Sequence, residues 1–281
     1  ILFTLLLAIY FILTVLSSKS IESLSLFATG NYQLRYAILF FLLILLLAEG
    51  IFHFYYYLIS QKFDFITYKM QTGYNNAIWS ENGFIELLQV VFLSISTILF
   101  YYFLKKNFNY FKILLKSLII LYFLGLLYYL FEEISWGQHF FGWQTTQFFL
   151  NINTQNETNF HNTSSILNEL PRNLLLIWCS LSFFLVRFIN DKFYIMKNLI
   201  LPNINLKFIS ILILLFVIPD KLVDIFSLAP GHPALNNNEI FLNIFYEIIS
   251  FNFIRLSELQ ELLFNLYILC HSYYLIKLRF V

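Results

Sequence analysis

The chain has 281 residues, of which 59% are hydrophobic and only 12% are charged, and its formal net charge at pH 7 is +1. Soluble domains carry about 25% charged residues, so this chain has too little charge to coat a water-soluble globule, and lipid is its predicted solvent. A net charge this close to zero disfavours nucleic acid as a partner. The two cysteines, Cys179 and Cys270, lie inside apolar runs and indicate no disulfide framework.

Apolar runs long enough to cross a bilayer dominate the chain. A helix needs about 20 apolar residues to span the hydrocarbon core, and seven runs approach that length. They predict an all-α fold, a polytopic transmembrane helix bundle that forms a single membrane domain over 1–281. An eighth run, 239–254, carries Glu247 in its middle and is interpreted as an interfacial or re-entrant helix. The seven predicted spans are 1–16, 36–59, 83–104, 113–131, 173–189, 208–226 and 259–277.

The loops between these spans divide the basic residues unequally. Most of the 17 Lys and Arg residues fall in one alternating set of loops and at the adjoining helix ends. Cytoplasmic loops collect Lys and Arg, which predicts that the N-terminus is outside and the C-terminus inside. This set comprises 17–35, 105–112, 190–207 and the C-terminal residues.

The stretch FEEISWGQHFFGW, residues 131–143, places two adjacent carboxylates at the end of an apolar run. Glu132 and Glu133 close a predicted helix, where exposed carbonyls disfavour negative charge by about 0.3–1 kcal/mol each, and they also repel one another. They therefore need a partner, such as Arg172, a histidine, an indole N–H or a metal. The alternative is a solvated pair just beyond the membrane, because tryptophans such as Trp136 are also ordinary interfacial anchors.

The connection 132–172 is the longest between predicted spans, and loops of this length are uncommon unless they are functional or disordered. Its many phenylalanines argue against disorder and predict a folded extracytoplasmic cap loop. Glu157 and His161 are spaced four apart, which places both on one face if the segment is helical. The candidate substrate-binding residues of this loop are Trp136, Gln138, Trp143 and Asn156.

Ionisable residues within spans are costly in lipid and mark either buried pairs or functional sites. Glu49 and His53 share a face of the predicted span 36–59. They form either a hydrogen-bonded pair between helices or a pair that handles protons or metal. Glu86 lies one turn inside the span 83–104 and is a candidate site residue, with helix capping as its ordinary alternative.

Three functions fit this pattern, and the sequence does not decide whether the protein is an enzyme. The first is an enzyme at the outer membrane face, which hydrolyses a lipid-like substrate or transfers a group on it. Its expected metal is a divalent ion such as zinc, held by Glu133, Glu157 and His161, because a zinc-bound water is a nucleophile near neutral pH. The second is an ion-coupled transporter that uses buried carboxylates. The third is a non-catalytic membrane subunit or assembly factor whose outer loop binds a partner. The candidate catalytic residues are Glu132, Glu133, Glu86, Glu157 and His161.

The runs FEEISWGQ (131–138), FGWQT (141–145) and NETNFHN (156–162) resemble an uncharacterised family of multi-span bacterial integral membrane proteins. In that family a Glu-Glu-x-Ser-x-Gly-Gln run precedes a Gly-x-x-Thr element and an Asn-Glu-x-Asn-x-His-Asn run. The chain departs from this pattern at His139, where the family pattern has arginine. The resemblance implies that these segments act as one unit in a bacterial cytoplasmic membrane, and it adds no reaction.

Overall fold

The structure is a computed structural model, and several of the predicted elements lie outside the residues that it describes. Those outside are the span 1–16, nearly all of the span 36–59 with the pair Glu49 and His53, and the helix 239–254. The described residues are 41, 43–44, 83–153, 156–185, 198–199, 206–225 and 256–278.

These described ranges are helical, with no strand among them. The long helices are α5 (Phe84–Asn107), α6 (Ile113–Glu133), α9 (Ser165–Leu185), α11 (Lys207–Ile225) and α14 (Leu256–Lys277). The short helices are η1 (Phe108–Tyr110), η2 (Ser135–Gly137), α7 (Gln138–Phe141), α8 (Gln147–Ile152) and η3 (His161–Thr163). The predicted helical fold class is therefore confirmed for this part of the chain.

Two of the described helices are long and apolar enough to cross a membrane. They are α5, continued through η1 to Tyr110, and α6, with mean hydropathies of 2.0 and 2.1 in their most apolar windows. They coincide closely with the predicted spans 83–104 and 113–131. Half of the window in α5 is buried inside the bundle, but only 11% of that in α6 is buried. The helix α6 therefore presents a long apolar surface to its surroundings.

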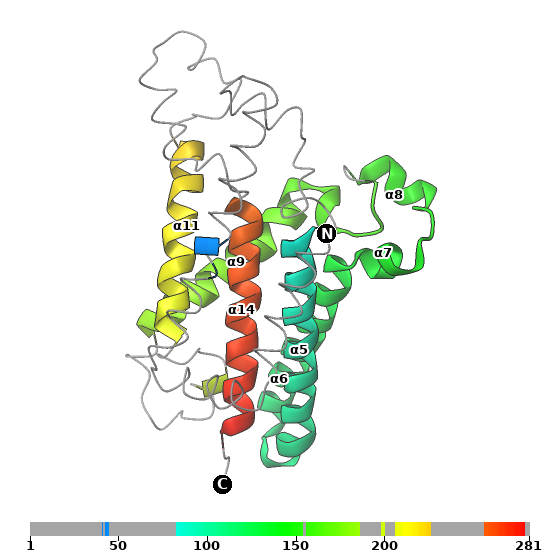
Figure 1. The fold of residues 1–281 in the computed structure, drawn as a ribbon. Coiled ribbons are helices and arrows are strands. Elements are labelled where there is room, and N and C mark those ends of the chain that lie inside the picture. Colours follow the sequence, from blue (N-terminus) through cyan, green and yellow to red (C-terminus); the bar gives the residue numbers. More distant parts are fainter. Residues whose placement is uncertain are drawn as a thin grey trace.

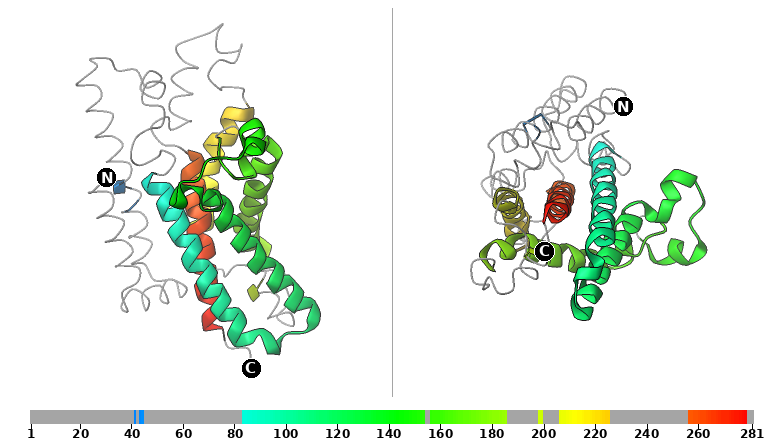
Figure 2. Two further views of the ribbon diagram at one scale, coloured as in Figure 1. Left: turned by 90° about the vertical axis from the view of Figure 1, so that its right-hand side faces the viewer. Right: turned by 90° about the horizontal axis from the view of Figure 1, so that it is seen from below.

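The centre of the bundle is α14, which lies between α5 and α11 (Figure 1). Viewed along the bundle, α6 packs on the far side of α5, and α9 lies beside both α11 and α14 (Figure 2). The core side chains of these helices are almost fully buried, with Leu88, Phe103, Ile213 and Phe264 all 0% exposed. This packing holds α14 in place, and α14 in turn supplies one wall of the cavity described below.

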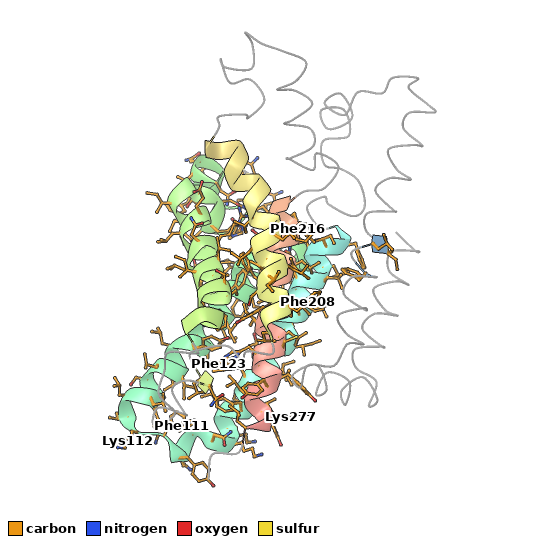
Figure 3. The ribbon with its side chains drawn as sticks, turned by 90° about the vertical axis from the view of Figure 1, so that its left-hand side faces the viewer. Phe111, Lys112, Phe123, Phe208, Phe216 and Lys277 are labelled. Atoms are coloured by element: carbon orange, nitrogen blue, oxygen red, sulfur yellow. The ribbon has the colours of Figure 1, made fainter. Side chains whose placement is uncertain are left out.

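Charge is segregated between the two ends of the bundle. One end, which we call the lysine end, carries Lys112 at the start of α6 and Lys277 in the last turn of α14 (Figure 3). Lys105 and Lys106 close α5 at this same end. The opposite end is where α6 finishes and α14 begins. It carries Glu86, Glu132, Glu133, Arg172, Glu258 and Glu261 and is called the polar end below.

The helix α9 begins eight residues before the predicted span 173–189, within the predicted loop 132–172. Helix α6 continues to Glu133, and α9 begins at Ser165, so only residues 134–164 form the cap. The segment that precedes residue 173, ILNELPR, is amphipathic, and hydropathy locates the apolar part of a helix rather than its polar first turns. The short helices α7 and α8 of the cap project to one side of the bundle (Figures 1 and 2).

Candidate functional site

The cap begins with a tight turn of left-handed backbone. The φ angle is 45° at Ser135, 56° at Trp136 and 94° at Gly137. Residues other than glycine rarely adopt this region, and each such residue costs on the order of 1–3 kcal/mol. At Gly137 a Cβ atom would lie 3.2 Å from the side chains of Phe141 and Trp143. The contacts around this turn therefore stabilise a left-handed backbone conformation that Ser135 and Trp136 would otherwise disfavour.

Glu132 supplies the main contact between the end of α6 and the far end of the cap. Its carboxylate accepts hydrogen bonds from the indole Nε1 of Trp136 at 2.7 Å and from the backbone nitrogens of Phe160 at 2.7 Å and His161 at 2.9 Å. The imidazole Nδ1 of His161 lies 3.4 Å from the same carboxylate. Glu132 is 3% exposed, and these donors replace the water that a buried carboxylate loses. The predicted need for a partner is met here by the cap itself.

Glu157 belongs to a hydrogen-bond network inside the cap. Its carboxylate accepts from Ser135 Oγ at 2.9 Å and from Asn159 Nδ2 at 2.7 Å, and Asn153 Nδ2 donates to Asn159 Oδ1 at 2.7 Å. Asn153 and Asn159 are 4% and 1% exposed. Glu157 therefore holds the strained turn of the cap, on the side of Ser135 rather than beside Glu133.

Gln138 also acts within the cap. Its amide oxygen accepts from the backbone nitrogen of Thr158 at 2.7 Å, and its amide nitrogen donates to Thr145 Oγ1 at 2.7 Å. The backbone oxygen of Asn156 accepts from the same Thr145 hydroxyl. Two residues predicted to bind substrate, Gln138 and Asn156, thus join distant parts of the cap to one another.

A cavity of about 570 Å³ lies between α6, α9 and α14. Its wall on α6 extends from Leu115 to Glu133, which at 1.5 Å per helical residue is about 27 Å, close to the roughly 30 Å hydrocarbon thickness of a bilayer. Leu121 and Leu174 line it and are 67% and 57% exposed, so the cavity opens sideways between α6 and α9. Most of the lining is apolar, while the ionisable groups Glu132, Glu133, His161, Arg172 and Glu261 gather at the polar end.

Arg172 and Glu261 form the ion pair at this end of the cavity. Both Nη2 and Nε of the guanidinium donate to Glu261 Oε1, the latter at 3.1 Å. Burial alone lowers the pKa of Arg172, but the neighbouring charge of Glu261 outweighs this effect and the pKa lies above its ordinary value. The guanidinium is therefore charged and already engaged.

Glu133 is in a different position from its neighbour Glu132. It lines the cavity, and its Oε1 is buried with no hydrogen-bond partner among the described residues. It lies within electrostatic range of Glu261, Glu258, Glu86 and Arg172. A buried polar atom without a hydrogen-bond partner costs about 1–3 kcal/mol. Glu133 therefore carries this cost at the polar end, because no described residue donates a hydrogen bond to its Oε1.

Further unpartnered polar atoms continue from this end toward the lysine end. Within the described ranges, both amide atoms of Asn265, the Nδ1 of His271, the Oγ of Ser272 and the hydroxyl of Tyr122 lack hydrogen-bond partners. Asn265, His271 and Ser272 are each 0% exposed. The His271 ring packs edge-on against Tyr122 at a centroid distance of 6.4 Å. These groups form a polar row along the inside of α14 and α6.

The predicted site residues therefore divide into two groups. Glu132, Glu133 and His161 line one cavity, and Glu86 lies within electrostatic range of Glu133. Glu157, Trp136, Gln138, Trp143 and Asn156 are not among the residues that line this cavity.

The tryptophans of the cap stack on neighbouring rings instead. Trp136 stacks on Phe131 at 5.4 Å and Trp143 on Phe141 at 5.5 Å, and the two indoles are 40% and 42% exposed. This position matches the ordinary role of tryptophan as an interfacial anchor.

The three predicted metal ligands do not come together. No group of three or more His, Cys, Asp or Glu side chains in the described part of the chain has the arrangement of a metal site. The reason is local: Glu157 turns toward Ser135 and Asn159, His161 contacts Glu132, and Glu133 faces the cavity. The expected zinc ligands Glu133, Glu157 and His161 are therefore not assembled into a metal site among the described residues.

Glu261 is the site residue that the sequence analysis missed. It lies near the start of α14, where acidic residues interact favourably with the helix dipole, and it pairs with Arg172. The signal available in the sequence was the opposite charge of Arg172, which is also a candidate partner for Glu132 and Glu133.

Comparison of the chain with protein-family models, with curated proteins and with solved structures yields no match. The resemblance carried by residues 131–162 therefore stays a prediction.

Proposed function

We propose that this protein is an integral protein of the bacterial cytoplasmic membrane that binds a lipid-like amphiphile in the cavity between α6, α9 and α14. The protein would hydrolyse or transfer a group at the head of this substrate. The observation that carries the proposal is the cavity itself, which combines a long apolar wall with a charged end where Glu133 has an unmet polar atom. Ligand sites typically combine an apolar lining with a few convergent polar groups.

The predicted topology supports this placement. We propose about seven spans with the N-terminus outside, and the segregation of charge supports it, because the lysine end would face the cytoplasm under the positive-inside rule. The polar end and the cap would then lie at the outer face. The sideways opening between α6 and α9 would let an amphiphile enter directly from the bilayer.

In this proposal Glu133 is the general base. Its carboxylate takes the proton from an attacking water or hydroxyl and returns it to the leaving group as the bond at the head group breaks, a contribution of about 10²- to 10⁴-fold in rate. Arg172 and Glu261 form the opposite side of the polar end and orient the head group. Glu132 and His161 keep the cap closed over this end.

Gly125 offers a direct test of the cavity. It lines the cavity, and a Cβ added there meets nothing within 4 Å. Gly125→Trp is expected to obstruct the cavity with its indole ring, and Gly125→Ala, whose Cβ meets nothing within 4 Å, is the matched control that leaves the cavity open. Binding of a hexadecyl amphiphile to the purified protein in a non-ionic detergent is measured by native mass spectrometry. Loss of binding only in Gly125→Trp supports the proposal, whereas equal binding by all three proteins refutes it.

An ion-coupled transporter is a second candidate, favoured by the polar row along α14 and α6. Buried polar side chains inside a membrane bundle mark ion or proton pathways. Under this alternative, the protein in proteoliposomes carries a proton flux that Glu133→Gln and His271→Phe each abolish. A wild-type flux no greater than that of empty liposomes eliminates this alternative.

A further inference from the structure

The exposed side of α6 carries a single apolar row along the helix. Only 11% of the most apolar window of α6 is buried, and this helix is long and apolar enough to cross a membrane. Side chains spaced three and four residues apart lie on one side of a helix. Four such side chains form the row and are between 40% and 67% exposed: Leu121, Leu124, Tyr128 and Phe131. Under the membrane placement proposed above, this row faces the acyl chains of the bilayer.

The apolar row continues from the end of α6 onto the cap. The indole of Trp136 stacks on the ring of Phe131 at a centroid distance of 5.4 Å and meets the ring of Tyr128 edge-on at 6.3 Å. Further along the cap, Trp143 stacks on Phe141, which is 78% exposed. The exposed apolar surface of α6 therefore extends past the end of the helix onto aromatic side chains of the cap.

The part of the cap that projects from the bundle carries no formal charge. No Lys, Arg, Asp or Glu occurs between Glu133 and Glu157, and both α7 and α8 lie in this stretch, to one side of the bundle (Figures 1 and 2). A water-exposed protrusion normally carries charged side chains, since these residues are mostly found on protein surfaces. This stretch instead pairs an uncharged sequence with exposed aromatic rings.

The side chains of α8 separate by polarity. Phe148 and Ile152 are four residues apart, share one side of the helix and are 61% and 40% exposed. On an adjacent side, Gln147 Nε2 donates a hydrogen bond to Asn151 Oδ1 at 3.3 Å. Helices that lie in the plane of a membrane interface have one apolar side, rich in Trp, Phe and Leu, and one polar side. The short helix α8 has this division.

Resting on the membrane placement in the proposed function, we infer that residues 134–152 of the cap insert their exposed aromatic side chains into the head-group layer of the outer leaflet. The partner of this surface is the lipid itself. Large exposed apolar surfaces mark contacts with either proteins or membranes. Three observations favour the membrane: the surface continues the apolar row of α6, it carries no formal charge, and it projects sideways at the end of an apolar helix, where aromatic belts form.

This contact also sets the depth of the cavity in the bilayer. Trp136 donates a hydrogen bond to Glu132 at 2.7 Å, and Glu132 and Glu133 both line the cavity. An indole in the head-group layer therefore holds the polar end of the cavity at the depth of the lipid head groups. The apolar wall that continues along α6 toward Leu115 then lies beside the acyl chains.

Spin labels on single introduced cysteines test this inference by measuring depth. The protein is placed in vesicles of palmitoyl-oleoyl phosphatidylcholine, and power saturation compares access of oxygen, which concentrates in lipid, with access of a water-soluble nickel chelate. The wild-type protein, whose Cys179 and Cys270 are buried, gives the background. The label on Phe148→Cys is expected about 5–10 Å into the boundary between head groups and acyl chains. A second label, on Phe141→Cys, should give the same result if Phe148→Cys does not fold.

Gln147→Cys is the matched control on the same helix. Because Gln147 lies on the polar side of α8, its label is expected to be nearer to water than that on Phe148→Cys and severalfold more accessible to nickel. An equal depth of the two labels overturns the inference. Labels at positions 141 and 148 that are shielded from both reagents also overturn it, since the surface would then be covered by protein.

A label on Leu121→Cys separates failure of this inference from failure of the proposed function. Leu121 lies ten residues before Phe131, which is about 15 Å along the helix, so its label is expected deep in the hydrocarbon. If the label at 121 is deep while those at 141 and 148 are in water, the membrane placement stands and the inference fails. If the label at 121 is also in water, the membrane placement in the proposed function fails, and the inference fails with it.

Discussion

Replacing Glu132 with alanine removes the acceptor that joins α6 to the end of the cap. Three donors lose their partner: the indole of Trp136 and the backbone nitrogens of Phe160 and His161, at 2.7, 2.7 and 2.9 Å. A hydrogen bond to a charged group contributes about 1.5–3 kcal/mol. Because Trp136 is 40% exposed and can turn to water, we count mainly the two backbone bonds. The expected loss is therefore about 3–6 kcal/mol in the local stability of the cap.

Hydrogen exchange measures this loss directly. Every 1.4 kcal/mol changes an equilibrium constant tenfold, so the amides of Phe160 and His161 should exchange at least about 100-fold faster in Glu132→Ala. The amides of buried α5 residues such as Leu88 should change little, because the effect is a local opening of the cap.

Glu132→Gln is the matched variant. It keeps one carbonyl acceptor and loses the charge, so it should recover part of the protection at Phe160 and His161. If Glu132→Ala changes the exchange of these two amides by less than twofold, then Glu132 does not hold the cap and the reasoning is wrong.

Two further predictions concern stability. Gly137→Ala should lower the free energy of unfolding by about 1–3 kcal/mol, because φ is 94° and the new Cβ would crowd two aromatic rings. Thermal unfolding measures this loss. An unchanged unfolding midpoint would contradict the strain at this turn. Arg172→Met should destabilise the protein by about 1–3 kcal/mol by leaving Glu261 unpaired. Adding Glu261→Gln should restore most of that loss. A double-mutant cycle in chemical unfolding measures this coupling, and additive losses would show that the pair contributes nothing.

The helices themselves could be predicted because hydropathy is a local property. The runs 83–104 and 113–131 are apolar enough to identify α5 and α6 whatever packs around them. The amphipathic start of α9 could not be located in the same way. Arg172, near this start, pairs with Glu261 of α14, and a hydropathy profile contains no information about that contact.

The composition and the charge pattern of the chain by themselves predicted a helical protein with apolar helices of membrane-spanning length, and they singled out an unusual pair of acids. The sequence indicated that Glu132 and Glu133 both required partners, since both oppose the helix dipole. Their separate environments were decided only by the tertiary structure. Successive residues of an α-helix point about 100° apart, so Glu132 faces the donors of the cap while Glu133 faces the cavity beside Arg172 and Glu261. The surroundings of these two acids come from segments that lie up to about 130 residues further along the chain and meet α6 only after folding. Those segments decide that Glu132 gains hydrogen-bond donors and that Glu133 lines the cavity.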